Sequence, residues 1–433
     1  MPMRITDAEE GLLKKAGPSS KSFRIVVIWV VTIGLGLAIS TFVSLKLLKE
    51  FRTIQPNSRC QFPAIFNFGD SNSDTGSESA AFGRLPLPFG QTFFGKPSGR
   101  RSDGRLIIDF MAQRLRIPYL SAYLDSIGSN FRHGANFAYS GSTVMEMVCM
   151  NQPLHLVTQV REFQQFKQRI AELHNQGMNL YLRNFLPRTQ DFSKALYMID
   201  SGQNDLYYGL TSKPVKQVKA YIPSIIDQLA LVIQTLYQEG ARTFWIHNTG
   251  PIGCLPIMVK NNPPRHRNAD KNGCIVSYNK VAKDFNIQLH DKISRLRTQM
   301  QDALIVYVDM YSAKYSIIDQ AKKLGLRDGL EPCCGPLKEG NIRGKEIQNG
   351  TCCSNPNEYI NWDNTHYTEA ANNWVANFII NGSYSEPPVA LTEAACTKPI
   401  QETKIIIRSS TSTRNEDGNL GSYFKQRWRR ILN

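Results

Sequence analysis

The sequence lacks internal repeats, and 42% of its residues are hydrophobic, so neither a solenoid nor a globally disordered chain is expected. It also lacks a cluster of basic and aromatic residues in its central body, although the net charge of the 433-residue chain is +15. Residues 63–396 contain 34 basic and 29 acidic residues, so most of the excess charge belongs to the two ends. Nucleic acid is therefore not expected as a partner.

The nine cysteines lack the C-x-x-C spacing that wraps a tetrahedral metal ion. Two vicinal pairs, Cys333-Cys334 and Cys352-Cys353, favour disulfides over a zinc site, and we expect neither a metal ion nor a cofactor. The sequence does not determine the connectivity. The candidate bridges are Cys254 to Cys274, two links between the vicinal pairs, and Cys60 to Cys396, with Cys149 left over.

One segment lacks charge altogether. Residues Ile25 to Leu45 carry no charged side chain and would span roughly 32 Å as a helix, enough to cross the hydrocarbon core of a membrane. A cleaved signal peptide is the alternative, and Ala38-Ile39-Ser40 offers a weak cleavage site. The preceding 24 residues include three acidic side chains, which favours an uncleaved anchor with a cytosolic tail and a lumenal body.

The sequence also indicates a compartment. Sequons for N-glycosylation at Asn349 and Asn381 agree with the secretory pathway. We therefore expect a single-pass membrane protein with its globular body in the Golgi lumen, or a secreted protein if the apolar segment is cleaved. The predicted organisation is a cytosolic tail (1–24), a signal anchor (25–48), a linker (49–59), one globular domain (60–397) and a basic, disordered tail (398–433).

The globular body predicts an α/β fold, because short apolar runs alternate with longer helical patterns, as in a parallel sheet. The predicted strands are Ala64–Phe68, a segment near 129–138, Ala195–Ile199, Thr243–His247 and Ile305–Asp309. The predicted helices are Arg105–Arg114, Val157–Asn175, Val215–Glu239 and Asn279–Ala303, and residues 325–359 are expected to form a loop stapled by disulfides.

The motif with most chemical content is the octet from Gly69 to Gly76, which directly follows the first predicted strand. It places the hydroxyl of Ser71 at the carboxyl end of a strand, where parallel sheets bind ligands. A solvated turn rich in Ser, Asn and Asp is the alternative for the octet taken alone.

Three further segments supply the remaining groups for ester cleavage, which needs a nucleophile, a base with an orienting acid, and donors for the oxyanion. Asp363 and His366 are three residues apart, a spacing that lets the carboxylate orient the imidazole, although Asp363 could merely cap a helix. Gly141 could present its backbone N–H and Asn204 its side-chain amide, although the segment around Asn204 could be an ordinary turn.

Together these segments resemble the plant GDSL esterase/lipase family of the SGNH hydrolase superfamily, in the subgroup with early-nodulin-like and fucosidase-like members. The order Ser, Gly, Asn, His matches, and the likeness covers roughly residues 60–397. The matching segments are Phe62 to Gly76, Gly134 to Thr143, Asp200 to Asp205, Pro251 to Pro256 and Trp362 to Glu369.

The resemblance implies a three-layer α/β/α flavodoxin-like fold with a central parallel sheet. It implies a triad of Ser71, His366 and Asp363, and an oxyanion hole made by the N–H groups of Ser71 and Gly141 and the amide of Asn204. Three departures, Asn72, Tyr139-Ser140 and Tyr367, remove no reacting atom and are interpreted as effects on pocket shape.

Rival readings of single residues are weaker. His247 ends a predicted strand but has no carboxylate within three or four residues, so a buried or pocket-lining role is favoured over that of a base. Asp70 and Asp74 lie in one loop, which fits turn hydrogen bonding better than a pair of glycosidase acids.

The resemblance, together with the apolar N-terminal run, implies a serine esterase that removes acyl groups, above all acetyl, from a cell-wall polysaccharide such as xylan. Its expected partners are an acylated carbohydrate or another ester, and a membrane through the N-terminal helix. The alternatives are a fatty-acyl esterase of the same fold and an inactive glycan-binding member. A glycosidase is suggested only by the fucosidase-like relatives.

Overall fold

The computed structural model describes residues 34, 40–41, 61–146, 154–327, 329–335 and 352–397. The predicted cytosolic tail, linker and C-terminal tail lie outside these ranges, as do Cys60, Cys149, Asn349 and all but three residues of the predicted anchor. In the ranges that are described, no helix combines the length and the apolar character needed to span a membrane.

The core is a six-stranded sheet with the strand order β2-β1-β3-β4-β5-β6. Its strands are β1 (Ile65–Gly69), β2 (Gly134–Asn136), β3 (Leu196–Asp200), β4 (Thr243–His247), β5 (Leu304–Val308) and β6 (Ser385–Glu386). The first five pair in parallel, and β6 runs antiparallel to β5. An order of 2-1-3-4-5 is flavodoxin-like and reverses direction between β1 and β3, where such sheets bind ligands. The predicted α/β class and central parallel sheet are confirmed.

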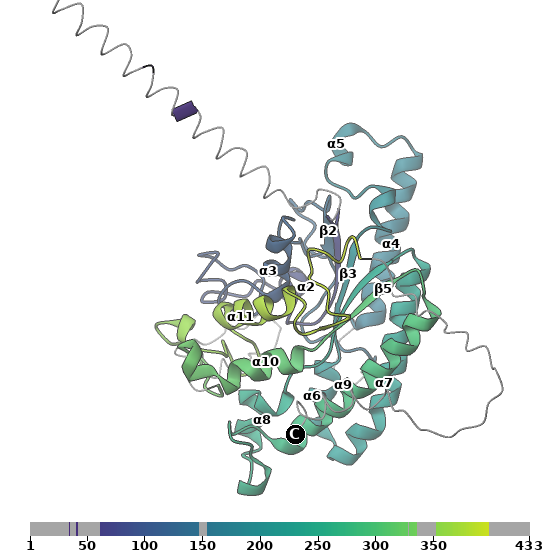
Figure 1. Cartoon of the computed structure of the whole chain (residues 1–433). Helices are drawn as coiled ribbons and strands as arrows, with labels where there is room; N and C mark the ends of the chain where they lie inside the picture. The colour runs from purple at the N-terminus through teal and green to yellow at the C-terminus, as the bar shows by residue number, and fades with distance from the viewer. Residues whose placement is uncertain are drawn as a thin grey trace, which may run out of the picture.

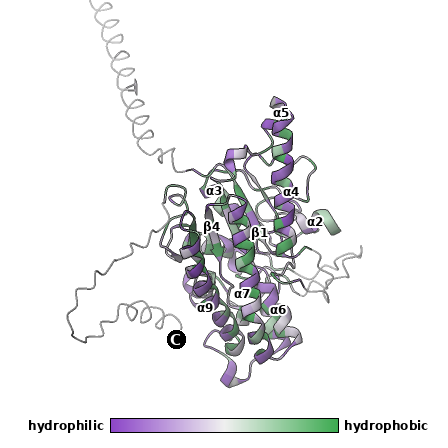
Figure 2. Ribbon diagram, turned by 90° about the vertical axis from the view of Figure 1, so that its right-hand side faces the viewer, coloured by the Kyte–Doolittle hydropathy of each residue, from purple (hydrophilic) through white to green (hydrophobic). Residues whose placement is uncertain are grey.

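Helices cover both faces of this sheet. The longer ones are α3 (Ile107–Arg114), α4 (Leu156–Asn175), α6 (Gln203–Ser212), α7 (Val215–Gln238), α9 (Val276–Gln299), α10 (Met310–Asp319) and α11 (Glu369–Ile380). The shorter ones are α2 (Ser77–Phe82), α5 (Leu180–Arg183) and α8 (Pro256–Asn261), with 3-10 turns at Thr189–Asp191, Ile252–Cys254, His266–Asn268, Ala321–Leu324 and Pro356–Glu358. Figure 1 shows the sheet with α3, α10 and α11 on one side and α4, α7 and α9 on the other. Hydrophilic and hydrophobic residues alternate along α4, α7 and α9, as expected for helices with one buried face (Figure 2).

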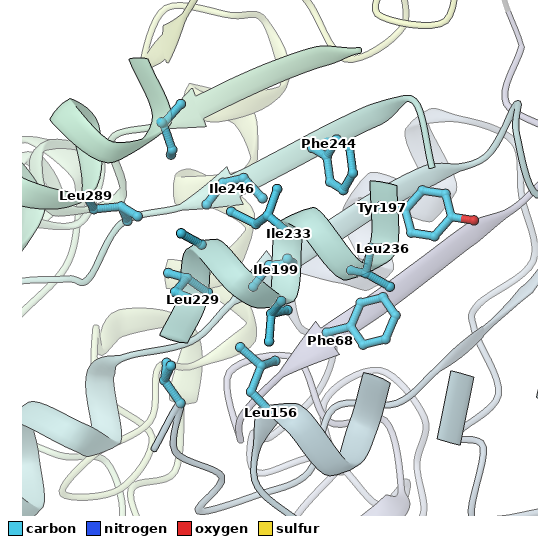
Figure 3. Packing of buried hydrophobic residues seen from close by; sticks show 14 of the residues in the cluster. Phe68, Leu156, Tyr197, Ile199, Leu229, Ile233, Leu236, Phe244, Ile246 and Leu289 are labelled. Atoms are coloured by element: carbon cyan, nitrogen blue, oxygen red, sulfur yellow. The ribbon is translucent and has the colours of Figure 1, made fainter. Parts of the chain in front are cut away.

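The strands are apolar on both faces, so alternate side chains enter two separate cores. Phe66, Phe68 and Tyr197 belong to the core shared with α4, α7 and α9. Figure 3 shows Phe68 and Tyr197 together with Ile233 and Leu236 of α7. The neighbouring positions, such as Ile65 and Leu196, enter the second core with α3, α10 and α11. The result is the predicted three-layer α/β/α arrangement.

Most predicted elements are found within a few residues of their expected bounds, and Thr243–His247 matches at both ends. The segment predicted near 129–138 forms a shorter strand, β2. The predicted helix Asn279–Ala303 runs from Val276 to Gln299 instead. Helices α6, α10 and α11, the short helices α2, α5 and α8, and the antiparallel β6 were not among the predicted elements.

Disulfides staple the loops as predicted. Cys254 is bonded to Cys274, and the two vicinal pairs are joined as Cys333 to Cys353 and Cys334 to Cys352. Cys396 is also disulfide-bonded, while its expected partner Cys60 is outside the described residues. The connectivity that the sequence left open is therefore determined for the two vicinal pairs.

Candidate active site

Ser71 lies in the turn that follows β1, at the point where the strand order reverses. The amides of Ser73 and Asp74 both donate to the carbonyl oxygen of Asp70, at 3.0 Å, and so close this turn. The buried carboxylate of Asp74 accepts from the amides of three following residues at the start of α2. The hydrogen bonding predicted for Asp70 and Asp74 within the turn is thus present, and Ser71 is half-buried on top of it.

A fully buried glutamine of α4 fixes the end of β1. Gln159 accepts from the amide of Gly69 at 2.9 Å and donates to its carbonyl oxygen at 2.8 Å. The same side-chain amide donates to Oγ of Ser142, at 2.9 Å. Gln159 therefore ties the segment before Ser71 to the segment after Gly141. No sequence pattern around Gln159 indicated this role.

Gly141 and Asn204 meet beside the Ser71 turn. Gly141 has a φ of 80°, a left-handed conformation that glycine adopts without steric cost. Nδ2 of Asn204 donates to the carbonyl oxygen of Ser142 at 2.8 Å and lies 3.4 Å from Oδ2 of Asp70. Asn204 thus contacts the residue after Gly141 and the residue before Ser71.

Asn204 is held by the start of α6. Gly202 precedes this helix with a φ of 115°, and a Cβ at that position would lie 2.6 Å from the ring of Phe285. A side chain is therefore excluded there. Asp205, the residue after Asn204, accepts hydrogen bonds from the backbone amides of Val144 and Met145. Burial raises the pKa of Asp205 to about 6, although these two amides act in the opposite direction.

Asp363 and His366 form a direct pair. Nδ1 of His366 lies 2.8 Å from Oδ2 of Asp363, and Oδ1 accepts from the backbone amides of Thr365 and His366. A hydrogen bond from the amide of Trp362 to the carbonyl oxygen of His366 closes this segment into a turn. The predicted contact between carboxylate and imidazole is present, on a turn that precedes α11.

The electrostatics of this pair favour an ionised acid. Burial alone would raise the pKa of Asp363, but the charge and hydrogen bond of His366, with two backbone amides, hold it at about 2. The carboxylate is thus ionised at neutral pH. In that state it fixes Nδ1 of His366 as the protonated nitrogen and leaves Nε2 free to accept a proton.

Arg101 and Ser102 connect the His366 segment with α2, the helix that begins six residues after Ser71. Arg101 forms an ion pair with Glu78 of α2. Ser102, which lies between these segments in the chain, donates from Oγ to the carbonyl oxygen of Tyr367 at 3.0 Å. The hydroxyl of Ser71 makes no hydrogen bond with any described residue. In enzymes without substrate such catalytic contacts are often long, and they tighten when substrate binds.

The rival base His247 is buried, with 1% of its surface exposed, in keeping with the favoured prediction. The sequence has no carboxylate within three or four positions of His247, but the fold supplies one from another strand. Its Nδ1 lies 3.4 Å from Oδ2 of Asp200 on the adjacent strand. Residues 47 positions apart in the chain become neighbours here because their strands pair in parallel.

Within the described residues, one group has the spacing of a metal site, namely Cys254, Asp270 and Cys274. Its two cysteines are joined to each other, so they offer no thiolate ligand. Of the two sequons, Asn381 lies exposed at the C-terminal end of α11.

Comparison with known proteins gives the family. The profile described as GDSL-like Lipase/Acylhydrolase matches residues 65–379. The chain belongs to this family. As a GDSL family member it is a hydrolase of carboxylic esters, and its relatives include the fucosidase-like and early-nodulin-like subgroup that the sequence resembled.

Three plant relatives illustrate the likeness. The GDSL esterase/lipase At5g14450 of Arabidopsis thaliana is 48% identical over 357 residues, covering 79% of this chain and 91% of the relative. Alpha-L-fucosidase 3 of the same plant is 42% identical, covering 79% and 97%. The GDSL esterase/lipase ENOD8 of Medicago truncatula is 43% identical, covering 78% and 91%.

Proposed function

We propose that this GDSL hydrolase is a serine esterase that removes acetyl groups from a cell-wall polysaccharide such as xylan. The observation that carries the esterase mechanism is the hydrogen-bonded pair of His366 and Asp363, in a segment that Arg101 and Ser102 connect to the helix after Ser71. Ser71 is assigned as nucleophile, His366 as general base and Asp363 as the acid that orients it.

In the proposed mechanism, Oγ of Ser71 attacks the ester carbonyl and passes its proton to Nε2 of His366. The N–H groups of Ser71 and Gly141 and the amide of Asn204 stabilise the negative oxygen of the tetrahedral intermediate. The intermediate collapses by breaking the bond between the acyl carbon and the sugar oxygen, His366 gives its proton to that oxygen, and an acetyl group remains on Ser71. Water, activated by the same imidazole, then attacks the acyl-enzyme and releases acetate.

Two features support a short acyl group on a polar substrate. Tyr139 is buried two residues before Gly141 and packs edge-on against Phe82, which takes up volume next to the oxyanion segment. The ion pair of Glu78 with Arg101 adds polar groups near His366 that can bind sugar hydroxyls. Both features fit acetylated carbohydrate better than a long hydrocarbon chain.

A fatty-acyl esterase is the second candidate. It is favoured by three large apolar side chains in the segment after Ser71, which are 44% to 53% exposed and could contact an acyl chain: Phe82, Leu87 and Phe93. A glycosidase, suggested by the name of one relative, gains no support from Asp70 and Asp74, because both carboxylates bond within one turn.

Turnover of acetyl esters and of long-chain esters separates the two candidates. We expect acetylated xylan and aryl acetates to be cleaved faster than esters of eight or more carbons, and Ser71→Ala to abolish turnover. A clear preference for long chains would refute the acetyl assignment. Unchanged hydrolysis by Ser71→Ala would exclude this nucleophile, and an intact protein without hydrolytic activity would favour a glycan-binding role.

We propose further that the enzyme acts in the Golgi lumen, anchored by residues 25–48. The support is the uncharged run Ile25–Leu45, the sequons and the disulfides. Protease treatment of intact microsomes should remove only the N-terminal tail. A mature N-terminus near Thr41 would indicate cleavage and a secreted enzyme instead.

A further inference from the structure

Beneath the Ser71 turn lies a group of four buried ionisable side chains that the proposed mechanism does not use. They are, with exposures from 1% to 9%, Asp70, Asp200, His247 and Lys314. Burying charges is costly unless they compensate one another, so such a group next to a reaction centre calls for a physical explanation.

The fold gathers these residues at the carboxyl end of the sheet. Asp70 follows β1, and Asp200 and His247 are the last residues of β3 and β4, paired in register. Lys314 reaches them from α10. The loop after β4 accommodates its side chain through Gly250, where a Cβ would lie 3.0 Å from Cδ of Lys314.

The two carboxylates interact unfavourably with each other and favourably with Lys314. Burial raises the pKa of Asp70 to about 7, the charge of Asp200 adds to this rise, and Lys314 opposes it. Burial acts to raise the pKa of Asp200 as well, but the nearby His247 ring and Lys314 outweigh it and lower the pKa. Lys314 is thus the cation whose charge lowers the pKa of both carboxyl groups.

Lys314 also contacts the segment that carries the proposed base. Its Nζ lies 5.1 Å from the ring centroid of Tyr367, the residue directly after His366. Among the described residues it makes no hydrogen bond and no direct ion pair, so its charge is balanced by the Tyr367 ring and, at longer range, by the two carboxylates.

The state of Asp70 bears on the oxyanion hole, because Oδ2 of Asp70 lies 3.4 Å from Nδ2 of Asn204. An ionised Asp70 attracts this amide and limits its rotation. Without a neighbouring cation, Asp70 would bind a proton more readily and this electrostatic restraint would weaken.

We propose that Lys314 is a positioning residue for ester hydrolysis, whose ammonium group compensates Asp70 and Asp200 and joins the Ser71 segment to the His366 segment through Tyr367. The proposal rests on the assignment of Ser71 and His366 under the proposed function. It gives a role to Tyr367, which the sequence comparison with the family marked only as a departure.

The test uses Lys314→Met, which keeps the length of the side chain and removes its charge, in the full-length enzyme with an aryl acetate as substrate. We expect kcat to fall about tenfold or more while KM changes less than about twofold. The acid limb of the pH profile should move to higher pH, because removing a cation raises the pKa of neighbouring acids. Lys314→Arg should restore most of the activity, and Lys322→Met, at an exposed position nearby, should behave as wild type.

A double-mutant cycle with Asp200→Asn distinguishes charge compensation from space filling. In Asp200→Asn, Asp70 no longer faces a second negative charge. Lys314→Met should therefore lower kcat by a smaller factor in this background than in the wild type. If Lys314→Met does not fold, Tyr367→Phe and Tyr367→Leu carry the test. The phenylalanine keeps the ring face and should retain kcat, whereas the leucine should not.

The proposal is overturned if Lys314→Met keeps the wild-type kcat and pH profile. It is also overturned if Lys314→Met lowers kcat by the same factor in the wild type and in Asp200→Asn while the acid limb of the pH profile stays in place. For the Tyr367 pair, equal kcat values would overturn it. These results differ from a failure of the proposed function, in which the wild type would be inactive or Ser71→Ala would remain active.

Discussion

Asp363 accepts two backbone amides with the same carboxylate that binds His366, so one residue both shapes the turn and orients the imidazole. In Asp363→Asn the amide oxygen can still accept the backbone hydrogen bonds, whereas its NH₂ group would face Nδ1. His366 would then carry its proton on Nε2 and could not accept one from Ser71.

We therefore expect Asp363→Asn to lower kcat on the order of a hundredfold or more with little change in KM. Steady-state kinetics on an aryl acetate check this, with Asp302→Asn at an exposed position as the matched control. A variant with wild-type kcat would remove Asp363 from the triad.

The same pair predicts a pH dependence of stability. In the folded chain the pKa of Asp363 falls from 3.8 to about 2. The ionised carboxylate therefore contributes fully to the free energy of unfolding above pH 3.8, and this contribution is lost as the pH falls through 2. A shift of this size corresponds to about 2 kcal/mol. Urea unfolding of wild type and Asp363→Asn should show a free-energy difference that shrinks between about pH 4 and pH 2. A difference that stays constant over this range would contradict the assignment.

At the scale of elements, α4 supports the site through Gln159. In Gln159→Leu the buried amide of Gly69 loses its acceptor and Oγ of Ser142 loses a donor, while the apolar side chain still fills the space. We expect the free energy of unfolding to fall by about 1–3 kcal/mol, and kcat to fall because the turns at Ser71 and Gly141 lose their common support. Denaturant unfolding and kinetics check both effects.

Gln165→Leu, on the exposed side of the same helix, is the control and should leave stability and kcat nearly unchanged. If both variants behaved alike, Gln159 would have no special part in holding the two turns.

Some helices and strands could be predicted from local sequence and others could not. Strand β4 and helix α7 were predicted almost to the residue, because an apolar run and a helical period are local signals. Helix α6 was missed because its start depends on Gly202 packing against Phe285, more than eighty positions away. Strand β6 is two residues long and exists only through its pairing with β5.

At the scale of the whole molecule, the expected compartment has a direct test at Asn381. This side chain is exposed at the end of α11, so a glycan can attach without disturbing either core. When the protein is made in plant or animal secretory cells, we expect a loss of mass after enzymatic removal of N-glycans. Replacing Ser383 by Ala destroys the sequon and should abolish the part of this change that is due to Asn381. A protein without any glycan at Asn381 would count against the lumenal location.

The two halves of the site depend on the molecule as a whole. Ser71, Gly141 and Asn204 follow β1, β2 and β3, whereas His366 precedes α11. The amide of Trp362 donates to the carbonyl oxygen of His366, and Trp362 belongs to a small core with Phe89 and the vicinal disulfides. The segments meet because adjacent parallel strands end at one edge of the sheet and α11 packs on α3 and α10.

The sequence by itself determined the parallel α/β class, the main strands and helices, and the four segments that hold the proposed reacting groups. These follow from local patterns, such as an apolar strand followed by a glycine-bounded turn, or an acid and an imidazole three residues apart. Only the tertiary structure decided that Asp200 faces His247, that Gln159 fixes the end of β1, and that Lys314 lies between the carboxylates and Tyr367. Those contacts join residues tens to hundreds of positions apart, and their partners are selected by strand register and helix packing, which no local spacing encodes.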